Sequence, residues 1–331
     1  MMARTGQRGR EHREELIVLL SNGPDKLGRR SWLRATWRTV VEFIEDDLPD
    51  RAASLTYYAM LSIFPGLLVL LAVVSLIGGP TGRNVVNGMR SLAIGPTAEV
   101  LNDSINSLQQ DQRAAGIFAV VAFLIAFWSA TGYVGAFRRA ANAIYDVPEG
   151  RPLWKTVPVQ LLVTLITGIF LALSALTVFL SGRLAERVGH AVGLEPDTVR
   201  IYEVIKWPSL VVVFALVVAL LYWVAPNARH GFRLITPGTV LATIVWIAVS
   251  AGFAFYIQHF DSYNRTYGTL GGVVVFLVWM WLTNVAVLLG AEFDAELARA
   301  RAIAAGLPPH AEPYLPMREV PSQEPAATAD Q

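Results

Sequence analysis

The residues of this chain that are best suited to chemistry are ionisable, amide and aromatic side chains at the ends of long uncharged stretches. One set should gather at a single face of the molecule: Arg51, Tyr57, Trp128, Ser129, Arg138, Asn284, Glu292 and Asp294. Two interpretations of this set stay open. Arg51 or Arg138 pairs with Glu292 or Asp294 and fastens helix ends, or the set forms a gate or a site for an anionic headgroup.

A second polar set lies close together in the sequence, between residues 258 and 268. It consists of Asp261, Tyr263, Asn264, Arg265, Tyr267 and Gly268. Tyrosines at such a position serve as interfacial anchors, so structural anchoring is favoured over binding.

Catalytic and metal-binding patterns are not recognisable in the sequence. The five histidines lie far apart without ligand spacing, and the chain has no cysteine. We therefore expect no metal site and no cofactor. Without a Gly-rich phosphate loop or a Ser/His/Asp constellation, we also expect a protein that is not an enzyme.

Six uncharged windows separate the polar residues. They cover 22 to 31 residues each, at residues 52–82, 114–137, 156–182, 207–228, 234–258 and 266–291. About 20 helical residues cross the hydrocarbon core of a bilayer, which is roughly 30 Å thick. Only 16% of the residues are charged, whereas soluble domains have about 25%. The sequence thus predicts an all-α fold, a polytopic membrane helical bundle with six transmembrane helices.

The distribution of Lys and Arg predicts the orientation of the bundle. Sorted by alternate sides of the six windows, 19 of these residues fall on the side of both termini and 8 on the other. Basic residues are enriched in cytoplasmic segments, so both termini should be cytoplasmic. The net charge of +1 argues against a nucleic-acid partner; membrane lipids are the expected partners.

Three regions follow from this pattern: a cytoplasmic arm at residues 1–51, the six-helix domain at 52–298 and a largely disordered cytoplasmic tail at 299–331. Residues 32–48 have the apolar spacing of an amphipathic helix, which either lies at the inner membrane interface or packs on the bundle. A short outer helix is expected within residues 84–112. Pro65 falls near the middle of the first window, where it should kink that helix.

Three segments resemble the BrkB/YihY membrane protein family, a group formerly labelled ribonuclease BN. They are Asp50-Arg51-Ala52-Ala53-Ser54-Leu55-Thr56-Tyr57-Tyr58-Ala59 with Phe64-Pro65, then Trp128-Ser129-Ala130-Thr131-Gly132 with Asn142-Ala143-Ile144-Tyr145-Asp146, and Tyr267-Gly268-Thr269-Leu270-Gly271-Gly272 with Gly290-Ala291-Glu292-Phe293-Asp294. The resemblance implies a six-helix protein of the bacterial inner membrane with cytoplasmic ends.

The resemblance supplies no reaction, so no catalytic residue is carried over. A transporter of a small molecule or a translocase of lipids or other envelope components is the first hypothesis. A non-transporting structural or assembly factor is the alternative. A ribonuclease is disfavoured, because the sequence offers no basic groove or soluble domain for RNA.

Overall fold

A computed structural model describes residues 27–77, 112–180, 185, 196–229, 231, 233–259 and 264–320, and all of its regular elements are helices. In chain order they are α2 (Arg29–Glu45), α3 (Leu48–Ile77), α6 (Gln112–Ile144), α7 (Leu153–Phe179), α9 (Pro196–Val224), α10 (Pro237–His259) and α11 (Asn264–Ala304). The all-α prediction is confirmed for these residues. The outer helix expected within residues 84–112 falls outside them, apart from Gln112 at the start of α6.

Five helices contain stretches long and apolar enough to cross a membrane. These are Val120–Ile144, Leu153–Val178, Asp197–Val224, Pro237–Ile257 and Gly271–Ala304, and they coincide with the second to sixth windows. Their outer faces carry exposed large apolar side chains such as Leu162, Ile169, Ile205 and Ile244. The first window begins on α3 but runs beyond Ile77, outside the described residues.

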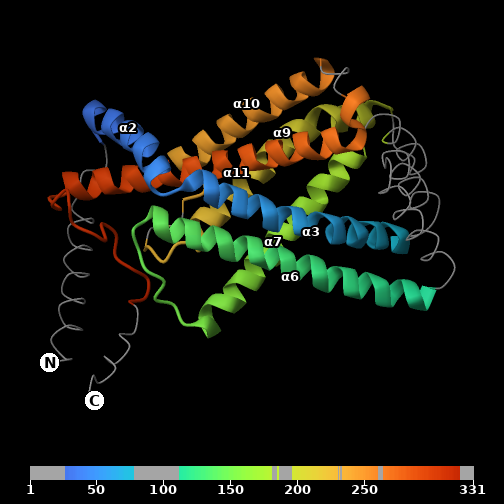
Figure 1. Ribbon diagram of the computed structural model, residues 1–331, viewed down its shortest axis with the longest axis horizontal. Helices are drawn as coiled ribbons and strands as arrows, with labels where there is room; N and C mark the ends of the chain where they lie inside the picture. Colours follow the sequence, from blue (N-terminus) through green and yellow to red (C-terminus); the bar gives the residue numbers. More distant parts are fainter. Residues whose placement is uncertain are drawn as a thin grey trace.

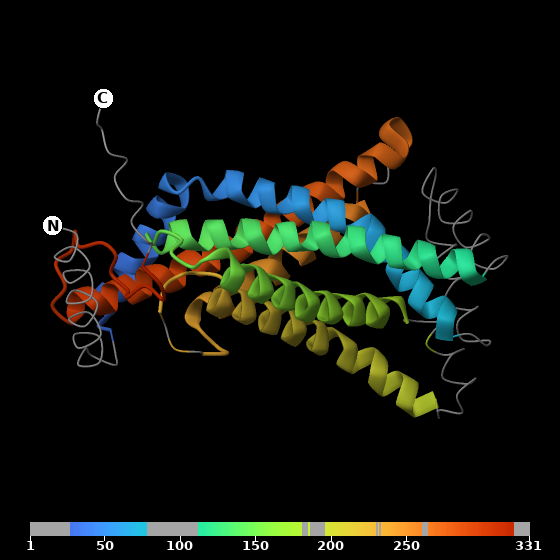
Figure 2. The same ribbon diagram turned by 90° about the horizontal axis from the view of Figure 1, so that it is seen from below.

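The long helices lie roughly lengthwise beside one another (Figure 1). α3 packs most extensively on α6, and α10 packs on α11, while α7 lies between α6 and α9. α2 and the segment after α11 are found at the same end of the bundle (Figures 1 and 2). The core includes the fully buried side chains of Leu48, Leu55, Phe137 and Leu288.

A helix, α2, forms where the amphipathic helix was expected, but it ends at Glu45, three residues earlier than expected. Asp47 adopts a left-handed conformation with φ of 53°, which separates α2 from α3. Ala35 and Thr39 are buried on a helix that packs on α11. The apolar face lies elsewhere: Leu33, Trp37, Val40 and Ile44 are exposed. α2 thus contacts the bundle through small residues, through Phe43 and through the ring of Trp32 against Phe293, while Leu33, Trp37, Val40 and Ile44 stay exposed.

Pro65 lies inside α3, which continues as a helix to Ile77. Proline removes one backbone hydrogen bond from a helix interior and commonly bends the axis. The later part of α3 runs in a different direction from its beginning (Figure 2).

The tail differs from the prediction over residues 299–320. α11 continues to Ala304 and is terminated by Gly306, two residues beyond its end, whose φ of 108° suits glycine. The Gly306 and Leu307 amides bond back to the carbonyls of Ile303 and Ala302. The following segment is folded, because Leu307, Tyr314 and Leu315 are buried. The prediction of a largely disordered tail was therefore wrong up to Val320. Residues 321–331 lie outside the described part of the chain.

Two helices approach each other closely where Gly238 of α10 meets Gly290 of α11. A Cβ on Gly290 would overlap the Gly238 carbonyl oxygen and lie 2.5 Å from the Tyr222 hydroxyl and 2.8 Å from the Ala242 Cβ. Small residues let helix backbones approach in membranes, where packing rather than water exclusion holds helices together. Glycine is therefore required at both positions.

We expect Gly290→Ala to destabilise the protein by about 1–3 kcal/mol through overpacking. Gly252→Ala is the matched control, because no atom lies within 4 Å of its built Cβ and alanine favours a helix by about 0.5–1 kcal/mol. Thermal unfolding of both variants in one detergent, followed by near-UV circular dichroism, makes the comparison. Equal Tm values for the two variants would show that the close helix contact does not require glycine at position 290.

Candidate functional site

Asn284 is the polar centre of the bundle and joins three helices. Its side chain is 3% exposed. The Asn284 Nδ2 donates to Thr56 Oγ1 of α3 at 3.0 Å, and the Tyr133 hydroxyl of α6 donates to Asn284 Oδ1 at 2.9 Å. The structure thus confirms that this amide faces protein, since an unpaired amide in hydrocarbon costs several kcal/mol. Thr56 is a partner that was not among the site candidates.

Asp294 binds the start of α10. Its two carboxylate oxygens accept hydrogen bonds from the Gly238 amide at 2.8 Å and the Thr236 hydroxyl at 2.5 Å. The Thr236 hydroxyl oxygen also accepts from the Thr239 amide at 3.0 Å. The first amides of a helix lack intrahelical acceptors and favour a negative charge. Asp294 therefore serves as a helix-capping group.

The expected pairing of Arg51 or Arg138 with Glu292 or Asp294 was wrong for the described residues. Arg51 donates from Nε to the Asp46 carbonyl at 2.7 Å, and Arg138 lies 3.4 Å from Glu149. Glu292 is 2% exposed, and its Oε2 has no hydrogen-bond partner within the described part of the chain. Spacing alone could not show which way these side chains turn.

The carboxylates around Glu292 form an acidic region at the end of the bundle that carries α2. Neighbouring Glu296 receives a hydrogen bond of 2.7 Å from Arg38 of α2. Asp146, in the loop after α6, lies 3.7 Å from Arg299. Burial, with the nearby charge of Glu312 and Asp46, raises the pKa of Asp146 to about 6, although Arg299 opposes the shift. The region is thus only partly neutralised.

Tyr57, Trp128 and Ser129 do not belong to a polar site. Trp128 is 82% exposed and Tyr57 61% exposed, and Ser129 is half-buried. Tyr57 contacts the ring of Tyr58 at 5.5 Å between centroids. Aromatic residues at helix surfaces suit a lipid boundary. These three candidates do not meet Asn284 or Glu292.

The outer polar set lies only partly within the described residues. Asp261 and Tyr263 fall outside the described residues. Asn264, Arg265, Tyr267 and Gly268 lie in the first turns of α11, but their side chains are not described. The anchoring prediction for this segment stays a prediction.

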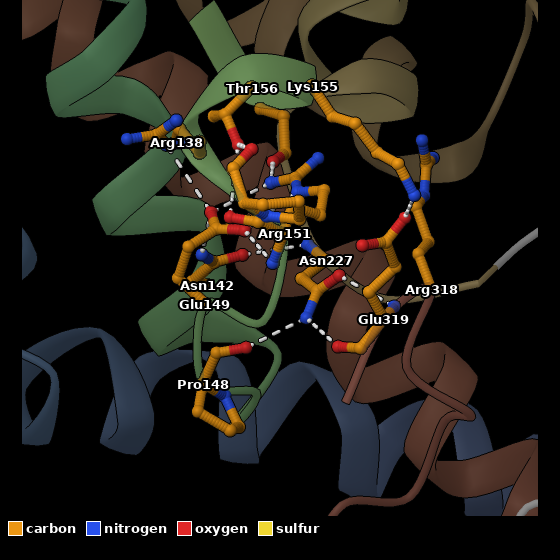
Figure 3. A network of polar contacts seen from close by, with 12 residues as sticks. Arg138, Asn142, Pro148, Glu149, Arg151, Lys155, Thr156, Asn227, Arg318 and Glu319 are labelled. Atoms are coloured by element: carbon orange, nitrogen blue, oxygen red, sulfur yellow. Dashed lines mark hydrogen bonds and ion pairs between the residues drawn. The ribbon is translucent and has the colours of Figure 1, made fainter. Parts of the chain in front are cut away.

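A cavity of about 220 Å³ lies where α6, α7 and α9 meet the folded tail. Four of its wall residues are cations, Arg138, Arg151, Lys155 and Arg318, and one is the carboxylate Glu319. The remaining wall is formed by Val134, Thr156, Val159, Gln160, Val163, Leu221, Val224 and Ala225. We call this the cationic cavity; Figure 3 shows the polar residues around it.

The carboxyl-terminal end of α9 positions two of the arginines that line the cavity. Arg151 donates to the carbonyls of Val224 at 3.2 Å and Ala225 at 2.7 Å. Arg318 donates to the carbonyls of Trp223 and Ala228. The last carbonyls of a helix have no intrahelical donor and attract cations. The helix end therefore fixes both guanidinium groups at the cavity.

Asn227 holds the loop and the tail around the cavity. It is fully buried; its backbone amide donates to Asn142 Oδ1 at 2.7 Å. Its side-chain amide donates at 2.8 Å to the carbonyls of both Pro148 and Glu319 (Figure 3). One amide side chain thus ties the α6–α7 loop to the tail.

The charges around the cavity perturb one another. Burial raises the pKa of Glu149, but hydrogen bonds from Arg151 and Asn142 outweigh it and leave the pKa below its usual value. Burial, together with the positive charges of Arg151 and Arg229, lowers the pKa of Arg318. Both directions indicate a site with an excess of positive charge.

Sequence reasoning found only Arg138 of this cavity. Arg151 and Lys155 were counted as loop cations, and Arg318 fell in a segment expected to be disordered. One signal was available on α7: polar residues recur at Thr156, Gln160, Thr164, Thr167 and Ser174, with the spacing of one helix face. Such a face inside an otherwise apolar helix indicates a protein-facing surface.

Long apolar helices with outward-facing apolar side chains and polar groups bonded internally define a multi-pass α-helical membrane protein. Comparison with protein families agrees. Residues 39–314 match the model of the family described as Virulence factor BrkB. The chain belongs to this family, as its three sequence segments indicated.

Several named relatives are similar over most of their length. The ribonuclease-like protein YfkH of Bacillus subtilis is 31% identical over 262 residues, which cover 76% of this chain and 90% of the relative. A UPF0761 membrane protein of Pseudoalteromonas translucida is 26% identical over 76% of this chain and 82% of its own length. No solved structure matches.

The bonds of Asn284 can be tested with a double-mutant cycle. We expect Asn284→Leu and Tyr133→Phe each to cost about 1–3 kcal/mol. The double variant should lose less than the sum by about 0.6–1.7 kcal/mol, the range of such pairs in membranes. Unfolding in mixed micelles with increasing SDS measures each loss. A control cycle with Tyr57→Phe should be additive, because Tyr57 faces outward.

Proposed function

We propose that the protein crosses the bacterial cytoplasmic membrane six times, with both termini in the cytoplasm. Five helices qualify by length and apolarity, and α3, at 30 residues, has the length for a sixth. An even number of crossings agrees with the position of α2 and the tail at one end of the bundle (Figure 1). The exposed apolar residues of α2 suit a helix that lies in the inner interface.

Cysteine labelling tests this topology, because the chain contains no cysteine of its own. In intact cells, Thr5→Cys and Ala327→Cys should stay unmodified by a membrane-impermeant maleimide and react only after lysis. Ala191→Cys, in the segment between α7 and α9, should react from outside. Labelling of one terminus alone in intact cells would contradict an even number of crossings.

We further propose that the protein translocates an amphiphilic, lipid-like molecule across this membrane. One observation carries the proposal: the cationic cavity continues into a polar face of α7. Thr156 and Gln160 line the cavity, and Thr164, Thr167 and Ser174 follow on the same face of the helix. At 1.5 Å per residue, Thr156 and Ser174 are about 27 Å apart along the axis, which is most of a bilayer core.

Contacts show that this face turns toward neighbouring helices. Gln160 Nε2 donates to the Thr131 carbonyl of α6 at 2.6 Å, and Thr164 and Thr167 are buried. Near the other end of α7, the Tyr202 hydroxyl of α9 donates to the Thr177 carbonyl at 2.8 Å. The Thr167 Oγ1 has no hydrogen-bond partner in the described structure. A polar group left unpaired at this depth favours a transient polar partner over pure packing.

The cavity also has an opening suited to an amphiphile. Its wall residues Val159 and Lys155 are 43% and 44% exposed, so the cavity is accessible from the α7 side. Leu153, Trp154 and Leu162 form an exposed apolar surface next to it. A headgroup can therefore enter the cavity while its chains stay against apolar side chains.

The alternative function is a non-transporting structural or assembly factor. The observation in its favour is the internal satisfaction of Asn284 and Asp294, which fasten helices and leave no free polar group on those side chains. The ribonuclease term occurs in the name of the Bacillus relative. Salt-sensitive RNA binding by the solubilised protein would support it for this chain.

Lipid movement in proteoliposomes tests the proposal. We expect the reconstituted protein to speed the exposure of fluorescent phospholipids to external dithionite, and Thr167→Val to at least halve that rate. This change keeps the shape of the side chain and removes only an unpaired hydroxyl, so the fold should persist. Thr243→Val is the matched control on α10, where the hydroxyl is bonded to the Thr239 carbonyl.

Absence of flux for a broad panel of lipids, from a protein with an unchanged Tm, would contradict translocation and favour the structural factor. Equal rates for wild type and Thr167→Val would remove the α7 face from the path.

A further inference from the structure

We propose that the cationic cavity is a binding site for a phosphate group, of the kind carried by anionic phospholipid headgroups, and that Glu319 of the tail is an internal competitor for it. The inference rests on the proposed function for its setting at the inner membrane rim. The inference goes beyond the proposed function because it names the class of substrate and the residues that select this substrate.

The charge inside the cavity is unbalanced. Four cations line the cavity, and two carboxylates form ion pairs with them. Glu149 accepts a hydrogen bond from Arg151 at 2.8 Å and lies near Arg138, while Glu319 pairs with Lys155. Two positive charges are left over. A phosphate monoester carries about −1.5 to −2 charges and three acceptor oxygens at pH 7, so it matches this excess.

The pairing of Arg138 is incomplete. Its Nε lies 3.4 Å from Glu149, too far for a good charged hydrogen bond, and neither its Nε nor its Nη1 has a hydrogen-bond partner among the described residues. Buried guanidinium groups ordinarily have all their donors paired. Arg138 is thus only partly neutralised by Glu149, and two of its nitrogens keep donors available for a ligand.

Glu319 occupies the exposed end of the cavity. The Lys155 ammonium bonds to its carboxylate, and Arg318 lines the same wall (Figure 3). This ion pair is half exposed, with 44% of the Lys155 side chain and 31% of the Glu319 side chain accessible. Exposed ion pairs are weak, typically below about 1 kcal/mol. A ligand phosphate can therefore displace the Glu319 carboxylate and pair with Lys155 and Arg318.

The backbone of Glu319 stays in place when its side chain leaves. Its amide donates to Asn227 Oδ1 at 3.2 Å, and its carbonyl accepts from Asn227 Nδ2 at 2.8 Å. Asn227 is buried and bonded to Asn142 as well. The competing carboxylate is thus held near the site by a fixed tether, which gives it a high effective concentration.

Binding to the purified full-length protein in an uncharged detergent tests the proposal without any transport step. The probes are dioleoyl phosphatidic acid, dioleoyl phosphatidylcholine and inorganic phosphate, and retained ligand is counted by native mass spectrometry. We expect phosphatidic acid to bind more tightly than phosphatidylcholine. Lys155→Gln should weaken phosphatidic acid binding by about tenfold or more, and Glu319→Gln should strengthen it severalfold.

Arg139→Gln is the matched control, since Arg139 is an exposed neighbour of Arg138 that does not line the cavity. It should leave the affinity unchanged. Binding of phosphatidic acid alone identifies a lipid headgroup as the source of the phosphate. Comparable binding of inorganic phosphate identifies a soluble phosphate as the source.

Equal affinity for the two lipids, or equal loss in Lys155→Gln and Arg139→Gln, would overturn the proposal. Weaker binding by Glu319→Gln would overturn the role of the competitor. Binding without lipid flux would refute only the proposed translocation, and flux that is unaffected by Lys155→Gln, with no selective binding, would refute only the phosphate site.

Discussion

Polar side chains inside a bilayer must find their partners within the protein, and α11 supplies most of the polar contacts that join the described helices. Asn284 bonds to α3 and α6, Asp294 caps the start of α10, and Glu296 accepts from Arg38 of α2. Each of these bonds restricts the rotation of one helix against another. A close backbone contact at Gly238 and Gly290 joins α10 to α11. α6 and α9, which both bond to α11, pack in turn on α7 and so frame the cavity.

The same constraint separates structural polar groups from candidate functional ones. Each side-chain polar atom of Asn284 and Asp294 has a partner, so these residues hold helices together. Arg138 and Thr167 keep donors or acceptors without partners in the described structure. Both lie along the proposed route, which begins at the cationic cavity and continues on α7. These two side chains are therefore the first places at which the proposed ligand can be tested.

The folded tail contributes to the site as much as the membrane helices do. Arg318 and Glu319 reach the cavity because Tyr314 and Leu315 are buried and because Asn227 bonds to the backbone of Glu319. A short extended segment can therefore add one cation and one competing anion to a pocket built by helices that lie far away in the sequence. Changes in the tail should act on the membrane domain through this contact.

The order and types of the residues were enough to identify the class of the molecule and most of its long helices. Uncharged windows of 22 to 31 residues have one economical explanation in lipid, and the cost of an unpaired amide required Asn284 to face protein. The three family segments identified the family without any structure. These conclusions depend on local composition and on the thickness of a bilayer.

Which polar residues meet became clear only from the folded molecule. Arg51 turned to a neighbouring carbonyl and Arg138 to Glu149, although the sequence offered Glu292 and Asp294 as equally plausible partners. The tail is rich in Pro, Glu, Ala and Gln and was expected to be disordered, but Tyr314 and Leu315 are buried against distant elements. The rotation of each helix and the docking of the tail depend on the shape of the whole bundle, so no local pattern of residues predicts them.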